Sequence, residues 1–150
     1  MKYIIDAYNL IGKLSVISLS DTKKEDKLIS FLKNLPSKPH DRFVCVFDGK
    51  SKSSLCMSVS DFFNIKMIFT DPEQSADSYI IDYCVKKKNK SGFIVVSSDN
   101  EIVNRVRKLR IKTFSCQEFL NYFKSFDGGK NEKDVFYNDI NFWLNTFNSE

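Results

Sequence analysis

Short apolar runs that each end in a polar residue recur along the first 125 residues. Residues 3–5 form the first run, which ends at Asp6, and residues 42–47 form the second, which ends at Asp48. Neither run has the spacing of a helix or the alternation of a half-exposed strand, which predicts strands buried on both faces. Three later runs predict strands over 64–70, 93–99 and 112–114.

Segments with helical spacing lie between these strands. Residues 22–25 have the spacing of a capping box, with Asp21 as a competing cap, and Pro36 is expected to end the helix that follows. Ser75 and Ser115 are the expected N-caps of two later helices. The alternation predicts an α/β domain with a central, mostly parallel sheet flanked by helices. Loops are predicted over 12–20 and 50–60.

A break in the pattern separates the end of the chain. The stretch 127–130 holds two adjacent glycines, and beyond it Phe136, Ile140, Trp143 and Phe147 recur at helical spacing. An exposed aromatic stripe would be an aggregation liability. We therefore predict one domain over 1–125, followed over 126–150 by a linker and an amphipathic helix that packs on that domain.

The sequence indicates where in the cell the protein is expected. No apolar run approaches the roughly 20 residues of a membrane span, and Met1 and Lys2 lead into a strand rather than a signal peptide. We expect a cytoplasmic protein without a membrane partner.

The numbers of cysteine and histidine residues also limit the kinds of metal site and catalysis that are expected. The four cysteines are widely scattered and His40 is the single histidine, which argues against a zinc site, structural disulfides and a histidine base. The cysteines are expected to be reduced and structural. Any catalysis must then use carboxylates.

Positive charge is concentrated in the second half of a chain whose net charge is +4. Lysines crowd 86–90, and 105–112 includes Arg107, Lys108 and Arg110. Taken alone, solubility and favourable placement at helix C-termini explain such runs best. The alternative is a footprint for a phosphate backbone.

Four carboxylates are expected at one edge of the sheet, because each follows a strand or opens a helix. They are Asp6, Asp48, Asp77 and Asp99. Any one of them alone is explained as a turn or cap residue, and the first turn of a helix stabilises Asp77. Together they would repel one another unless a cation lay among them, and clustered oxygen ligands suit Mg²⁺ or Mn²⁺. The four together therefore favour a metal-dependent phosphodiesterase site.

The motifs around these acids resemble the NYN domain, and most closely its YacP-like branch, which is related to PIN-domain nucleases. They occur in the order and approximate spacing of that family at 6–12, 46–49, 69–77 and 97–99, with a similar ending at 114–119. The resemblance covers roughly residues 1–123. It implies a single PIN-like domain and a Mg²⁺- or Mn²⁺-dependent endoribonuclease, with some members acting on mRNA at the ribosome.

The resemblance also implies roles for particular residues. By position, Asp6, Asp77 and Asp99 are catalytic and hold the metal, with Asp48 beside them. Asn9 is expected near the substrate, and Ser98 is expected to support its loop or touch a phosphate. As our own inference, cations outside the family motifs hold the RNA backbone, namely Lys50, Lys52, Arg107, Lys108 and Arg110.

Two departures from the family pattern leave an alternative open. Ile81 stands where a further acid is expected, with Asp82 as its neighbour, and Gln74 stands where another is expected, next to Glu73. The site is then weakened or holds one metal. The alternative function is a non-catalytic RNA- or ribosome-binding module. A nucleotide-binding or phosphoacceptor domain has little support, because no glycine-rich phosphate motif occurs. The identity of the RNA and the oligomeric state stay open.

Overall fold

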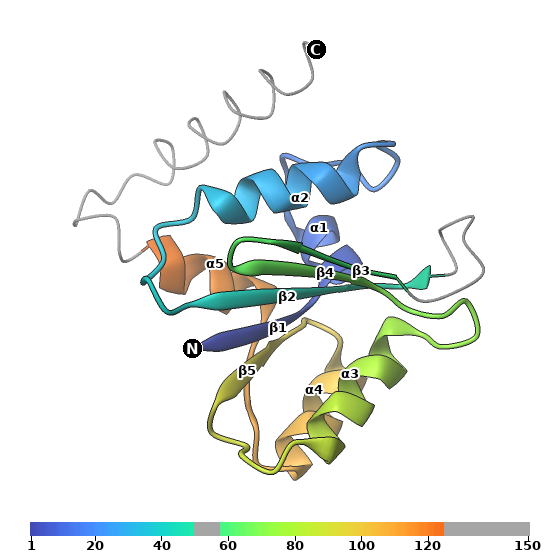
Figure 1. The fold of residues 1–150 in the computed structure, drawn as a ribbon, viewed down its shortest axis with the longest axis vertical. Coiled ribbons are helices and arrows are strands. Elements are labelled where there is room, and N and C mark those ends of the chain that lie inside the picture. The colour runs from blue at the N-terminus through green and yellow to red at the C-terminus, as the bar shows by residue number, and fades with distance from the viewer. Residues whose placement is uncertain (50–57, 125–150) are drawn as a thin grey trace.

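The computed structural model describes residues 1–49 and 58–124 as a sheet between two layers of helices (Figure 1). Its strand order is β3-β4-β2-β1-β5-β6, and only β3 runs antiparallel to its neighbour. This confirms the predicted α/β class. The elements are β1 (Lys2–Asp6), α1 (Ala7–Lys13), α2 (Lys24–Lys33), β2 (Arg42–Phe47), β3 (Ser58–Phe62), β4 (Ile65–Phe69), α3 (Ala76–Lys86), β5 (Phe93–Val96), α4 (Asn100–Lys108), β6 (Lys112–Phe114) and α5 (Cys116–Lys124).

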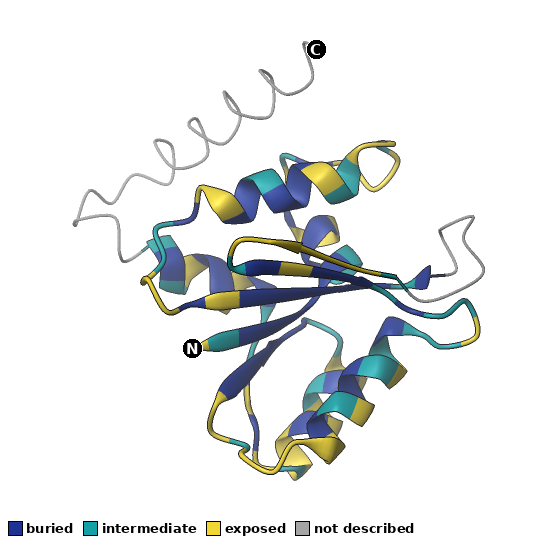
Figure 2. Ribbon diagram, in the orientation of Figure 1, coloured by how far each residue is buried: buried dark blue, intermediate teal, exposed yellow. Residues whose placement is uncertain are grey.

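Two of these elements were not predicted. Helix α1 begins directly after Asp6, so its buried residues Ala7, Leu10 and Ile11 continue the apolar run of β1 and hide the change of period. Strand β3 occupies part of the predicted loop over 50–60. It is an edge strand, exposed along most of its length (Figure 2), and therefore lacks a hydrophobic pattern.

The structure has the predicted N-caps at α3 and α5 but not the one at α2. At α2 the prediction was wrong: the N-cap position is Lys23, which makes no side-chain cap, and the carboxylate of Asp21 accepts the N–H of Lys23 at 2.8 Å. At α3 the hydroxyl of Ser75 accepts the N–H of Ser78 at 3.1 Å, as predicted. At α5 the cap is also confirmed, because Ser115 and Glu118 each accept the other's N–H, at 3.0 and 2.9 Å.

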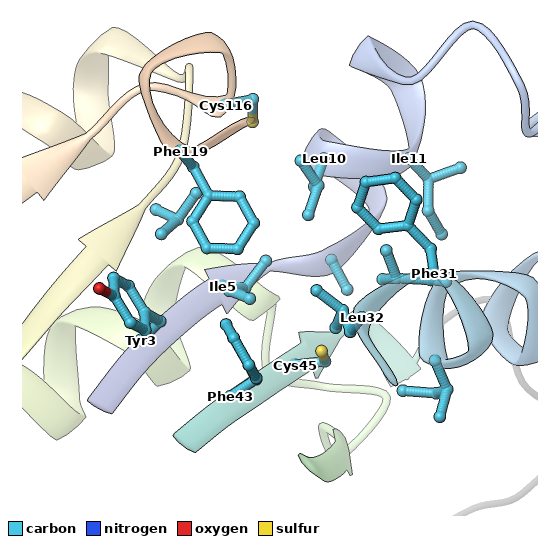
Figure 3. Close-up of a cluster of buried hydrophobic side chains, with 14 of the residues drawn as sticks. Tyr3, Ile5, Leu10, Ile11, Phe31, Leu32, Phe43, Cys45, Cys116 and Phe119 are labelled. Carbon is cyan, nitrogen blue, oxygen red and sulfur yellow. The ribbon is translucent and has the colours of Figure 1, made fainter. Parts of the chain in front are cut away.

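An aromatic core fixes α5 to the middle of the sheet. The ring of Tyr3 stacks on Phe43 with centroids 5.5 Å apart and meets Phe119 edge-on at 5.7 Å (Figure 3). Helices α1, α2 and α5 all cover this face (Figure 1). Burial of the rings is the main stabilising term here, and the edge-on geometry adds about 0.5–1.5 kcal/mol for each pair.

The opposite face carries a second core, under α3 and α4. Ile4, Val44 and Ile68 of the strands pack there with Ile80 and Val106 of the helices. Side chains alternate along a strand, so Asp6 lies on the same face as Ile4, two residues before it. The buried charge at the end of β1 is thereby directed toward α3.

The described cysteines are consistent with reduced, structural thiols. Cys45, Cys84 and Cys116 are buried and free, and Cys56 lies outside the described residues. The predicted linker and helix over 126–150 also lie outside them. No helix in the described part of the chain is long and apolar enough to cross a membrane.

Gly49 fixes the chain directly after β2. Its N–H donates to the hydroxyl of Thr70 at 2.9 Å, and a Cβ atom at Gly49 would lie only 1.6 Å from the carbonyl oxygen of Thr70. Glycine is therefore required by this close approach, which holds Asp48 beside the end of β4.

We predict that Gly49→Ala lowers the free energy of unfolding by at least about 2 kcal/mol, because backbone must move to admit the methyl group. The matched control is Gly12→Ala, where the nearest atom, Leu19 Cδ1, is 3.5 Å from the added Cβ. That change, in a helix, should stabilise by up to about 1 kcal/mol. Urea denaturation measures both, and equal effects would contradict the steric explanation.

Candidate functional site

Asp6 is a carboxylate held inside the domain at the end of the central strand. Its exposed fraction is 8%, and β1 is paired with β2 on one side and β5 on the other. Burial first, and the charges of Asp77 and Asp99 after it, raise its pKa from the ordinary 3.8 to about 7, against a hydrogen bond from Ser97 that lowers it. Near neutral pH this carboxyl group is thus poised between its two protonation states.

Asp77 enters the same site from the first turn of α3. Burial raises its pKa first, and the charges of Asp99, Glu101 and Asp48 raise it in turn. The direction shows that burial and the negative charges of its neighbours together outweigh the stabilisation that a helix N-terminus gives to a carboxylate. Three other elements therefore direct acids at α3, namely β1, the end of β2 and the start of α4.

Asp99 caps α4 and is tied to Asp6 through a serine. One oxygen of Asp99 accepts the N–H of Glu101 at 2.9 Å. The N–H of Asp99 donates to Ser97 Oγ at 3.1 Å, and the Ser97 hydroxyl donates to Asp6 Oδ2 at 3.4 Å. Ser97 is fully buried, so it can serve no role at the surface. It sets the position of one acid relative to another.

Asn9 and Ser98 hold the loops of the site together. Asn9 Oδ1 accepts the N–H of Ser98 at 2.7 Å and the thiol of Cys116 at 3.2 Å. The hydroxyl of Ser98 accepts the N–H of Cys116 at 3.0 Å. These contacts join α1, the turn after β5 and the start of α5. Both residues lie in loops beside the acids, and their contacts are those of positioning residues.

Sequence reasoning missed two contributors. Ser97 and Glu101 flank Asp99, and neither was a predicted site residue. A buried serine directly after an apolar strand was the available signal for Ser97, because an isolated buried hydroxyl needs a partner. For Glu101 the signal was a second acid in the first turn of the helix that Asp99 caps.

The predicted cations are not gathered with the acids. Arg107 and Lys108 lie in the last turn of α4, about 12 Å or more along its axis from Asp99, and Arg110 follows the helix. Arg107 Nε instead donates to Thr113 Oγ1 at 3.0 Å. Lys50 and Lys52 lie outside the described residues.

The two departures from the family pattern are built into the packing. Ile81 is buried in the core beneath α3. Its neighbour Asp82 is exposed, and its Oδ2 accepts from Gln74 Nε2 at 3.1 Å. Among the described residues, therefore, neither position supplies an extra acid to the site.

The carboxylate oxygens of these acids are the kind of ligand that a hard divalent cation prefers, but the side chains are not arranged around a common point. In addition to burial, the charges of neighbouring acids raise the pKa of Asp6 and of Asp77, and a bound cation would remove this repulsion. Within 1–49 and 58–124, however, no three His, Cys, Asp or Glu side chains are close enough to hold a metal ion as they stand. Binding would require the carboxylates to draw together.

The fold and the acidic edge together define the class: an α/β domain with carboxylates gathered where parallel strands end. The family model of the YacP-like NYN domain matches residues 3–141, and the chain belongs to this family. Membership indicates a nuclease-like function connected with RNA, and NYN nuclease domains typically use divalent metals.

Two solved structures are similar in fold. Both are of Rae1 (YacP) from Bacillus subtilis, one of them a mutant, and both are 20% identical in sequence to this chain. The mutant has a TM-score of 0.65, with 84% of this chain and 76% of that one covered; the other has 0.64, with 85% and 75%. No curated protein matches the sequence. These likenesses confirm the α/β fold with its mostly parallel sheet.

We predict that Asp6→Asn stabilises the metal-free protein at high pH. Because the folded-state pKa of Asp6 lies above its ordinary value, its contribution to stability is full below about pH 4 and is lost as pH rises through about 7. In EDTA the variant should therefore exceed the unaltered protein in unfolding free energy at pH 8, by roughly 4 kcal/mol at most. The two should converge near pH 4.

Urea denaturation across this pH range makes the measurement. Asp26→Asn, on the exposed side of α2, is the matched control and should change the unfolding free energy by less than about 0.5 kcal/mol at every pH. A difference at Asp6 that does not vary with pH would refute the assigned pKa.

Proposed function

We propose that this chain is a metal-dependent endoribonuclease that hydrolyses RNA phosphodiester bonds. The observation that supports the proposal is the electrostatic interaction of Asp6, Asp77 and Asp99, which come from three separate elements: burial first, and the charges of Asp77 and Asp99 after it, raise the pKa of Asp6 to about 7. A fold gains nothing in stability from collecting these charges. A catalytic site gains the means to bind a cation and a phosphodiester at one place.

The residues take different parts in this proposal. Asp6, Asp77 and Asp99 would hold Mg²⁺ or Mn²⁺, with Asp48 beside them. A cation bound there would lower the pKa of an attacking water and neutralise charge on the phosphodiester. Ser97 orients Asp6 and Asp99, and the contacts of Asn9 with Ser98 and Cys116 keep the turn after β5 in place, so the acids approach the substrate from fixed backbone positions.

The substrate we propose is single-stranded RNA, including mRNA in the cytoplasm. Action on the ribosome is part of this proposal only through the family resemblance. The cations beyond the acidic edge would hold the RNA backbone, since carboxylates alone repel it.

A second candidate is a non-catalytic RNA- or ribosome-binding module. Two observations favour it: the described acids are not arranged as metal ligands, and Ile81 is buried where the family pattern expects an acid. Such a module would bind RNA in a salt-sensitive manner that survives chelation.

The deciding prediction concerns Asp77→Asn. This change removes a charge that its neighbours already destabilise, so the variant should fold at least as stably as the unaltered chain. Cleavage of end-labelled single-stranded RNA in Mn²⁺ or Mg²⁺ should fall by more than about 100-fold, beyond the usual effect of losing a supporting residue. Translating mRNA, assayed in parallel, shows whether the ribosome matters.

The matched control is Asp82→Asn, five residues along the same helix and bonded to Gln74. Its cleavage rate should stay within about twofold. Full activity of Asp77→Asn would remove this residue from the site. RNA binding without cleavage in any metal would establish the binding module instead.

A further inference from the structure

An aromatic ring stands at the tip of the β3–β4 hairpin, at the edge of the sheet opposite to the acids. Phe63 begins the two-residue connection between these strands, has a φ of 54°, and is 97% exposed. This backbone region favours glycine and is rare for bulky residues. The chain therefore keeps a large apolar side chain in an unfavourable conformation and with no cover from its own domain.

Cations border this ring. Phe63 lines a pocket together with Lys2, Arg42 and Lys66, and the single acid in its lining is Asp61. Arg42 and Lys66 are exposed, and within the described residues neither makes an ion pair. All three cations lie within strands, so no helix C-terminus accounts for their charge.

The cations share a face of the sheet with the catalytic acids. Lys2 aligns with Arg42, and Lys66 aligns with Val44 two residues further on, so the alternation of strand side chains puts all three on the face of the second core. Asp6 lies four residues after Lys2 and is on that same face. The ring and cations thus lie at one end of a face whose other end is the acidic edge.

Part of this face is open. Helix α3 packs against β1 and β2, whereas Val59 of β3 and Lys66 of β4, which the strand register places on the same side, are exposed. The distance along β4 from its first residue to Thr70 is about 17 Å, or about five nucleotides at the 3.4 Å spacing of stacked bases.

We propose that the open face of β3 and β4 binds unpaired RNA, with a base stacked on Phe63 and phosphates held by Lys66 and Arg42. Both features are those of single-strand binding surfaces, which combine aromatic platforms with cations along the backbone. The excess of positive charge favours a polyanion over a second copy of this basic chain. The choice of RNA rests on the proposed function, whereas the surface itself does not include the acids.

Phe63→Gly tests the surface without weakening the fold. Glycine suits the positive φ, so thermal stability should be unchanged or higher. Affinity for a fluorescent unpaired 12-nucleotide RNA, measured in EDTA to prevent cleavage, should fall by at least about fivefold, because a stacked base is lost. Phe63→Trp should retain binding. Leu19→Ala, which removes an exposed apolar side chain elsewhere, is the matched control and should leave binding unchanged.

The salt dependence of RNA binding tests the roles of Arg42 and Lys66. Arg42→Gln and Lys66→Gln should each reduce the salt dependence of 12-nucleotide binding by about 0.7 in the log–log slope, the value for one phosphate contact on a single strand. A three-nucleotide RNA is too short to reach from the acids to Phe63, so its cleavage in Mn²⁺ should be insensitive to Phe63→Gly.

The outcomes separate this surface from the nuclease proposal. Binding that needs Phe63, in a protein that cleaves no RNA, supports the surface and refutes the nuclease. Cleavage together with 12-nucleotide binding that ignores Phe63, Arg42 and Lys66 refutes the surface and leaves the nuclease. Self-association that Phe63→Gly abolishes, with RNA binding unchanged, would assign this face to a second copy and overturn the proposal.

Discussion

The charge of Asp6 at the end of the central strand is the constraint on which the acidic edge depends. A strand buried on both faces has no room to turn its last side chain to solvent, and helix α1 begins at the next residue. The carboxylate must therefore be accommodated where it stands. Ser97 supplies one hydrogen bond, and burial with two neighbouring acids acts against it. Asp77 shares this cost, because burial and neighbouring acids raise its pKa as well.

The direction of the parallel strands determines where the other charged residues lie. Strand ends and helix N-termini meet at one edge, where the helix dipoles favour Asp77 and Asp99, although burial and the charges of neighbouring acids together exceed that help at Asp77. Strand starts and helix C-termini meet at the other edge, where Arg107 and Lys108 end α4. Mixed charge in the sequence thus becomes an acidic edge and a basic edge in the fold. A polyanion that binds at the acids gains attraction when it also reaches the basic side.

The α/β class and the order of the parallel strands along the chain were predictable, because buried strands carry a pattern that turns and edge strands lack. Helix α1 and strand β3 were not, since the first continues an apolar run and the second is exposed. Position along strands located Asp6 and Asp99. Ser97 was missed because its role depends on its contacts with two acids, Asp6 and Asp99. The contact with Asp6 follows from the pairing of β1 with β5, which the sequence alone does not define.

The hydrogen bonds around the acids hold the backbone of the site in place without a bound ligand. Asn9, Ser98 and Cys116 bond to one another and to backbone, so the turn carrying Asp99 is held by contacts that involve no ligand. The acids themselves lack a common arrangement as ligands among the described residues. A cation entering this edge would meet backbone that is already organised and side chains that repel one another. The ordering cost falls on a few carboxylate rotamers, which is a small part of the cost of building a site from mobile loops.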